Sequence, residues 1–92
     1  MDIEKIIIKQ LLQLVPSSEI LEIRANIGDK SCSVEFFATI NGSRTQCYEM
    51  IDNGLINEKD FDKSVKEIAR RVRLSSEYKA GEINKIRFTF RR

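Results

Sequence analysis

Apolar residues recur at intervals of three and four along the first fifteen residues of the chain. This spacing predicts an amphipathic helix from Asp2 to Val15 with a broad buried face. Pro16 ends the predicted helix, because its ring removes a backbone donor and disfavours helical geometry in the residue before it. The residues of the predicted buried face are Ile3, Ile6, Ile7, Ile8, Leu11, Leu12, Leu14 and Val15.

The next segments alternate between apolar and polar residues, which is the two-residue period of a strand with one buried face. A first strand is predicted over 21–27 and a longer one over 32–40, separated by a turn at 28–30. Phe37 departs from the pattern, because it is an aromatic residue on the face that the alternation assigns to solvent. The residues expected to face the core are Leu21, Ile23, Ala25, Ile27, Cys32, Val34, Phe36, Ala38 and Ile40.

Asn41 and Gly42 form the strongest hairpin signal in the sequence. Both residues tolerate the positive φ that a two-residue turn needs between right-twisted strands. The segment from Arg44 to Met50 is therefore expected to return as a third, antiparallel strand.

A second helix is expected after a loop at 52–54. Asn57 is suited to cap its first turn, and the helix is predicted to run from Glu58 to near Tyr78. Gly81 fits the end of this helix, since glycine readily adopts the left-handed conformation that follows many helices. The apolar stripe of the predicted helix consists of Phe61, Val65, Ile68, Ala69 and Val72.

A last strand is predicted where Ile86, Phe88 and Phe90 alternate with polar residues. The element order is then α-β-β-β-α-β. We expect one α+β domain over residues 1–92, because a chain of this length can bury one core and not two. A mostly antiparallel four-stranded sheet with two helices on one face buries both helix stripes and one face of each strand.

Targeting signals are not evident in the chain. Its longest apolar run, the three isoleucines at 6–8, is far shorter than the roughly 20 residues of a membrane span. The N-terminal residues also lack the basic and apolar regions of a secretory signal. We therefore expect no membrane association and a cytoplasmic location, where Cys32 and Cys47 would be reduced and structural.

Candidate chemistry is sparse. The chain has no histidine, the side chain that most often serves as a general base near neutral pH and as a zinc ligand. Glu58, Asp60 and Asp62 are spaced by two residues, which turns Asp60 away from the other two on a helix. The segment after Asp52 lacks the alternating oxygen ligands of a calcium loop, and the glycines are scattered singly. We expect a binding protein with no catalytic, cofactor or metal site.

The net charge of +2 hides a division along the chain. Residues 1–48 carry five basic and six acidic side chains, residues 49–62 carry one and five, and residues 63–92 carry ten and three. The three segments therefore have net charges of −1, −4 and +7, which sum to +2. The basic residues predicted to share one face are Lys66, Arg70, Arg71, Arg73, Lys85, Arg87, Arg91 and Arg92.

Such a basic face could neutralise phosphates, so nucleic-acid binding is one hypothesis. Against it, no basic segment is interleaved with exposed aromatic residues, and Phe88 and Phe90 belong to the set that faces the core. A solvated helix and a charged strand that resists edge pairing explain the same residues. Under the nucleic-acid hypothesis the binding residues are Arg70, Arg71, Arg73, Arg87 and Arg91.

Phe37 allows two interpretations. It packs beneath a loop, or it anchors a partner on an open face of the sheet. If that face is open, Glu35 and Phe37 belong to a flat polar surface with one apolar centre, which is suited to protein recognition.

Four features taken together resemble a known group of proteins. They are the amphipathic first helix, the segment Ser-Val-Glu-Phe-Phe at 33–37 before an Asn-Gly hairpin, the charged helix after Glu58, and Ile-Asn-Lys-Ile-Arg-Phe-Thr-Phe at 83–90. They resemble the αβββαβ antitoxins of the YezG type and some immunity proteins of contact-dependent growth-inhibition systems. The resemblance covers nearly the whole chain and is one of pattern. It implies a bacterial protein that binds and neutralises a cognate toxin, often a nuclease.

The resemblance brings no catalytic motif, so interface residues are expected from charge and exposure. Many immunity proteins for nucleases are markedly acidic, whereas this chain is weakly basic and offers only the acidic segment 49–62 to a basic toxin. A third possibility is an enzyme subunit or a scaffold piece without independent activity. The residues expected at a toxin interface are Phe37, Arg44, Asp52, Glu58, Asp60 and Asp62.

Overall fold

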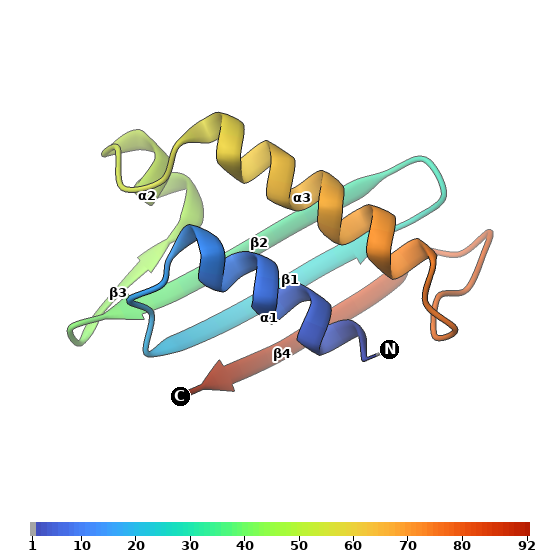
Figure 1. The fold of residues 1–92 in the computed structure, drawn as a ribbon, viewed down its shortest axis with the longest axis horizontal. Helices are drawn as coiled ribbons and strands as arrows, with labels where there is room; N and C mark the ends of the chain where they lie inside the picture. The colour runs from blue at the N-terminus through green and yellow to red at the C-terminus, as the bar shows by residue number, and fades with distance from the viewer. Residues whose placement is uncertain (1) are drawn as a thin grey trace.

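The computed structural model describes residues 2–92 as two layers, an antiparallel sheet with helices on one of its faces (Figure 1). The predicted α+β class and the order α-β-β-β-α-β are confirmed, with one short helix added before the long one. The elements are α1 (Ile3–Leu14), β1 (Ile20–Ile27), β2 (Cys32–Ile40), β3 (Ser43–Gln46), α2 (Cys47–Asp52), α3 (Glu58–Arg73) and β4 (Asn84–Arg91).

Strand β1 lies at the centre of the sheet, whose strand order is β3-β2-β1-β4. It pairs antiparallel with β2 on one side and with β4 on the other, along its whole length. Its core-facing residues are at most 2% exposed, as the alternation predicted. These residues are Leu21, Ile23, Ala25 and Ile27.

Both long helices begin at side-chain caps. The Asp2 carboxylate accepts the Glu4 N–H at 2.9 Å, which satisfies one of the free donors at the start of α1. Asn57 caps α3 as predicted, since its side-chain oxygen accepts the N–H groups of Lys59 and Asp60.

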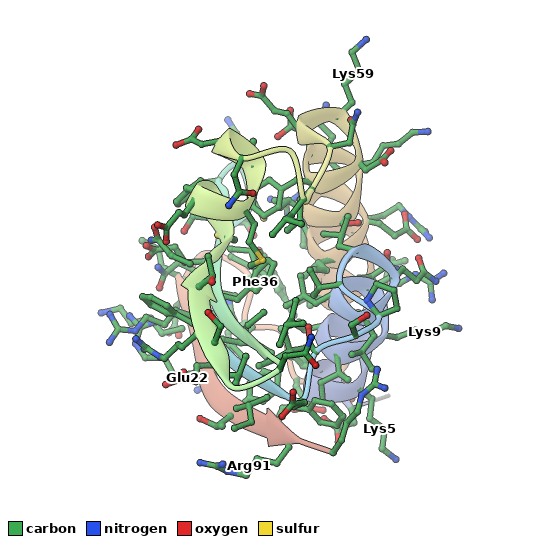
Figure 2. The ribbon with its side chains drawn as sticks, turned by 90° about the vertical axis from the view of Figure 1, so that its left-hand side faces the viewer. Lys5, Lys9, Glu22, Phe36, Lys59 and Arg91 are labelled. Atoms are coloured by element: carbon green, nitrogen blue, oxygen red, sulfur yellow. The ribbon has the colours of Figure 1, made fainter. Side chains whose placement is uncertain are left out.

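The core lies between the helices and the sheet. Figure 2 shows Phe36 between the two layers and Glu22 on the outer side of the sheet. Phe36 is 1% exposed, and its ring is tilted against that of Phe61 with the centroids 6.4 Å apart. No element within residues 2–92 covers the outer face of the sheet, so this face is open.

The predicted hairpin turn is confirmed. Asn41 and Gly42 have φ values of 51° and 77°, the positive values that a two-residue turn requires. Ile40 pairs with Ser43 directly across this turn, which sets the register of β2 against β3.

The third strand is shorter than predicted. Strand β3 ends at Gln46, and residues Cys47–Asp52 form the helix α2 instead of continuing the strand to Met50. Cys47 and Met50 are both 0% exposed, and a separation of three residues places two side chains on the same side in a helix but not in a strand. The prediction was wrong because so short an apolar run fits either period.

The long helix also ends earlier than predicted, at Arg73 instead of near Tyr78. The Tyr78 hydroxyl donates to the Asp29 carboxylate, and the Gly81 N–H donates to the same carboxylate at 2.9 Å. These bonds draw the segment after Leu74 toward the turn between β1 and β2, away from the helix axis. Gly81, with a φ of 82°, therefore belongs to a loop and does not end the helix.

The two cysteines are free thiols, as expected. Burial raises the pKa of both Cys32 and Cys47, so both remain protonated at neutral pH. Among residues 2–92, no helix combines the length and the hydropathy needed to cross a membrane.

The packing of α2 predicts the effect of truncating its buried residue. Met50→Ala should lower the free energy of unfolding by about 2–5 kcal/mol, because it removes a fully buried side chain and leaves a cavity. The neighbouring Glu49→Ala, an exposed position, should change it by less than about 0.5 kcal/mol. Urea denaturation of both variants measures the difference. Equal effects would mean that α2 does not pack on the core.

Candidate functional site

The open face of the sheet consists of the residues that alternate with the core positions. The strand register determines their neighbours. Glu22 lies between Phe37 and Thr89, and Arg24 likewise lies between one residue of β2 and one residue of β4. Five of the seven charged residues on this face are basic, which gives it a net charge of +3 by that count. These seven residues are Glu22, Arg24, Glu35, Arg44, Lys85, Arg87 and Arg91.

A cluster of three side chains from β3, β2 and β1 lies on this open face. The Arg44 guanidinium carbon is 3.7 Å from the centroid of the Phe37 ring. The same guanidinium donates to both carboxylate oxygens of Glu22, from Nε at 2.5 Å and from Nη2 at 3.3 Å. Phe37 therefore packs beneath an arginine side chain, and not beneath a loop as one of the two interpretations held. We call Glu22, Phe37 and Arg44 the stacked cluster.

The electrostatics of the stacked cluster follow from these contacts. The hydrogen bond from Arg44 lowers the pKa of the Glu22 carboxyl, with a smaller contribution from the nearby charge of Arg91. The same bond raises the pKa of Arg44. The side chains of Arg44 and Glu22 remain 53% and 38% exposed, so water screens their attraction and the ion pair adds little to folding stability. Its effect is to hold an arginine and an aromatic ring in one arrangement.

A shallow hollow borders the stacked cluster at the middle of the open face. Its volume is about 400 Å³, and residues of β1, β2, β3 and β4 line it, including Arg24, Glu35 and Arg87. Glu35 is fixed at its rim by a hydrogen bond of 3.1 Å from the Gln46 side chain. The hollow is open to solvent and does not enclose a ligand, so it is suited to a side chain of a macromolecular partner more than to a small molecule that needs an enclosed cavity.

The carboxylates expected at the interface lie elsewhere. Asp52 is the last residue of α2, and Glu58, Asp60 and Asp62 lie in the first turns of α3. All four are exposed, and none makes an ion pair with any of residues 2–92. We call these four residues the acidic end. The six residues expected at a toxin interface therefore fall into two groups, one at the acidic end and one, Phe37 with Arg44, on the open face.

The acidic end is itself divided by α3. Asp60 borders a hollow that it shares with Gln10 of α1, whereas Asp62 borders a different hollow with Cys32 of β2. The two carboxylates lie on opposite flanks of the helix because the buried Phe61 separates them.

The predicted basic face does not form, because its residues lie on two sides of the molecule. Arg70 and Arg71 both pair with Glu67 on the exposed side of α3, each at 2.7 Å, and these two arginines hold the pKa of Glu67 at about 2. Arg73 donates hydrogen bonds of 3.0 and 3.1 Å to two carbonyl groups in the turn between β1 and β2. The three arginines of α3 are thus engaged within the domain.

Arg87 and Arg91 lie on the open face of the sheet, which is the side away from α3. The prediction of one basic face was wrong because residues close in sequence were assigned to one surface without the sheet between them. Glu22 was not among the predicted site residues. Its contact with Arg44 across β2 depends on the strand order, which alternation alone does not provide.

Neither a clustered set of metal ligands nor a known relative accompanies these surfaces in the described part of the chain. Within residues 2–92, no group of three or more His, Cys, Asp or Glu side chains is arranged to hold a metal ion. Comparisons with protein-family models, with curated proteins and with solved structures find no match to this chain. The open face and the acidic end are therefore identified as candidate interaction surfaces from the geometry of this structure alone.

The stacked cluster predicts how the Glu22 carboxyl titrates. Arg44→Gln should raise the pKa of Glu22 toward its ordinary value of 4.5, and Arg91→Gln should raise it by less. Because the pKa of Glu22 is lower in the folded state, its ionised carboxylate stabilises the fold at pH values above the ordinary pKa. This contribution to stability is lost as the pH falls through the lowered folded-state pKa. NMR titration of the Glu22 side-chain carbon measures both shifts. An unchanged pKa in Arg44→Gln would contradict the contact.

Proposed function

We propose that this protein is an immunity protein, a noncatalytic domain that binds the toxic domain of a cognate bacterial protein and neutralises it stoichiometrically in the cytoplasm. A nuclease domain is the toxin class that we infer from the pattern the chain resembles. The absence of histidine from the sequence supports binding over acid–base catalysis.

The observation that carries the proposal is the stacked cluster on the open face. Arginine and aromatic side chains contribute most of the binding energy in many protein interfaces. Here Phe37 and Arg44 are already held against each other, so a partner would lose less side-chain entropy in ordering them. The adjacent hollow gives a partner side chain a place to insert.

The acidic end supplies a second, electrostatic contact under this proposal. Its four carboxylates are not neutralised within residues 2–92, so they can attract a basic nuclease domain over a distance. Such rim charges mainly accelerate association, whereas a packed anchor mainly slows dissociation.

The alternative, nucleic-acid binding through the arginines of α3 and β4, is less well supported by the geometry. Arg70, Arg71 and Arg73 are engaged within the domain, and the sheet separates them from Arg87 and Arg91. A single phosphate backbone would have difficulty in contacting both groups.

Co-expression with a toxin domain tests the proposal. The partner to use is the C-terminal domain of the protein encoded immediately upstream, since immunity genes of this kind usually follow their toxin gene. We expect the two chains to co-purify and the cells to survive only when this protein is present. Failure of both readouts would contradict the immunity function.

Two apolar residues on different surfaces, the partly buried Phe37 and the exposed Leu74, allow a matched test. Phe37→Ala should weaken the complex by about 10-fold to 100-fold, because it removes the apolar centre of the open face. Leu74→Ala, which truncates a residue 75% exposed at the end of α3, should leave the affinity unchanged. Isothermal titration calorimetry of both variants gives the comparison, and equal affinities would exclude the open face as the interface.

The acidic end has its own signature in the association kinetics. Reversing the charges of Asp60 and Asp62 to lysine should slow association with a basic toxin, and the difference from the unaltered protein should shrink as salt is added. Surface plasmon resonance at several salt concentrations measures the rates. Unchanged association would remove the acidic end from the interface.

A further inference from the structure

Strand β4 is the long free edge of the sheet. Its eight residues pair with β1 alone, and Figure 1 shows it as the outermost strand, with no described segment beyond it. The other edge strand, β3, has four residues and leads directly into α2. Edge strands present unpaired N–H and C=O groups to which another chain can bond.

The positions of these unpaired groups follow from the ladder between β1 and β4. The Arg92 N–H donates to the Glu19 carbonyl at 3.1 Å, and this bond shows which alternate residues of the C-terminal strand bond to β1. In an antiparallel pair, residues alternate between bonding to the partner strand and facing away from it. The residues that direct their N–H and C=O groups to the free edge are therefore Lys85, Arg87, Thr89 and Arg91.

The helix-facing side of β4 is incompletely covered. Ile86, Phe88 and Phe90 are only partly buried, although they pack against the core. Their counterparts on β1 are at most 2% exposed. The core therefore thins toward the free edge and leaves a row of apolar side chains beside it.

The first helix extends this apolar row. Ile8 and Leu12 are partly buried, and they lie on the flank of α1 opposite Gln10 and Gln13, which border the hollow between α1 and α3. That flank is on the β4 side of the molecule, because α1 lies between α3 and β4 in Figure 1. An added strand would find apolar side chains both beside it on β4 and above it on α1.

The open side of β4 carries unbalanced positive charge. Lys85, Arg87 and Arg91 make no ion pair with any of residues 2–92, and β4 itself has no acidic residue. If two copies of this chain joined through β4, these rows of like charge would lie beside each other and repel. The same charges attract a strand that carries carboxylates at the corresponding positions.

We propose that β4 binds a partner by strand addition, and that the partner strand has acidic residues on the open face of the sheet and apolar residues on the helix side. The inference rests on the proposed function only for the identity of the partner, the toxin domain. The backbone bonds supply affinity, and the two rows of side chains supply the selection among strands.

The test uses designed peptides and the complete protein. The probe is a fluorescein-labelled, end-blocked peptide in which glutamate alternates with valine, and its match has lysine in place of every glutamate. We expect the acidic peptide to bind at least about tenfold more tightly, by fluorescence anisotropy. We also expect it to slow the hydrogen exchange of the Arg87 and Thr89 amides, which point to the free edge.

Two controls separate strand addition from simple charge attraction. A peptide with N-methyl groups on its central glutamate and on the adjacent valine loses an N–H that faces β4 whether it pairs antiparallel or parallel, so it should bind the unaltered protein about tenfold less well. Thr89→Pro should have a similar effect, because proline is tolerated on an edge and removes one donor that faces the partner. Equal binding of the methylated peptide would overturn the proposal, and this control does not depend on a variant that folds.

Other occupants give distinct results. Concentration-dependent dimers that Thr89→Pro disrupts would assign the edge to a second copy of the chain. Displacement of the peptide by a short single-stranded oligonucleotide, with affinity retained in Thr89→Pro, would assign the basic row to phosphates. Either result overturns the proposal. Because no toxin is present in these experiments, their failure would leave the result of the co-expression test unaffected.

Discussion

The pairing of β1 with a strand on each side is the constraint on which the rest of the structure depends. Its odd-numbered residues form the floor of the core, and its even-numbered residues Glu22 and Arg24 form the middle of the open face. A slip of one residue in either ladder would exchange these two sets and bury charge. One strand therefore sets the position of the core and of the candidate site at once.

The charged side chains of the two layers differ in the partners that they contact. On α3, Glu67 pairs with Arg70 and Arg71, and Arg73 bonds to backbone carbonyls, so these arginines serve the domain itself. On the sheet, Arg44 packs on Phe37, and the other arginines make no ion pair with any of residues 2–92. Ion pairs as exposed as these contribute little to folding stability, and under the proposed function the unpaired basic residues of the sheet are available to a partner.

Local patterns in the sequence predicted the parts of the fold that depend on local physics. The helical period, the strand alternation, the Asn41–Gly42 turn and the Asn57 cap each involve residues close along the chain, and each was confirmed. The end of α3 was not predictable in this way, because Asp29 competes for the segment after Leu74 from more than forty residues away.

The candidate site was only partly predictable for a similar reason. Alternation identified Phe37 as unusual, and the hairpin brought Arg44 near it. Neither could show that Glu22 completes the cluster from the far side of β2, since that requires the strand order. The single basic face failed because the charges along the chain were counted without the sheet that separates Arg73 from Arg87.

The pairing of β4 with β1 also determines when the domain can be completed. Ile27 pairs with Asn84 and Ile20 with Arg91, so the pairing of the central strand cannot be completed until the last strand of the domain has been synthesised. Until then, one side of β1 and the apolar residues beneath it remain uncovered, and contacts so distant in sequence form slowly. A ribosome that has made α1, β1 and β2 has therefore not yet made a working domain. The sheet is complete only once β4 has been synthesised and has paired with β1.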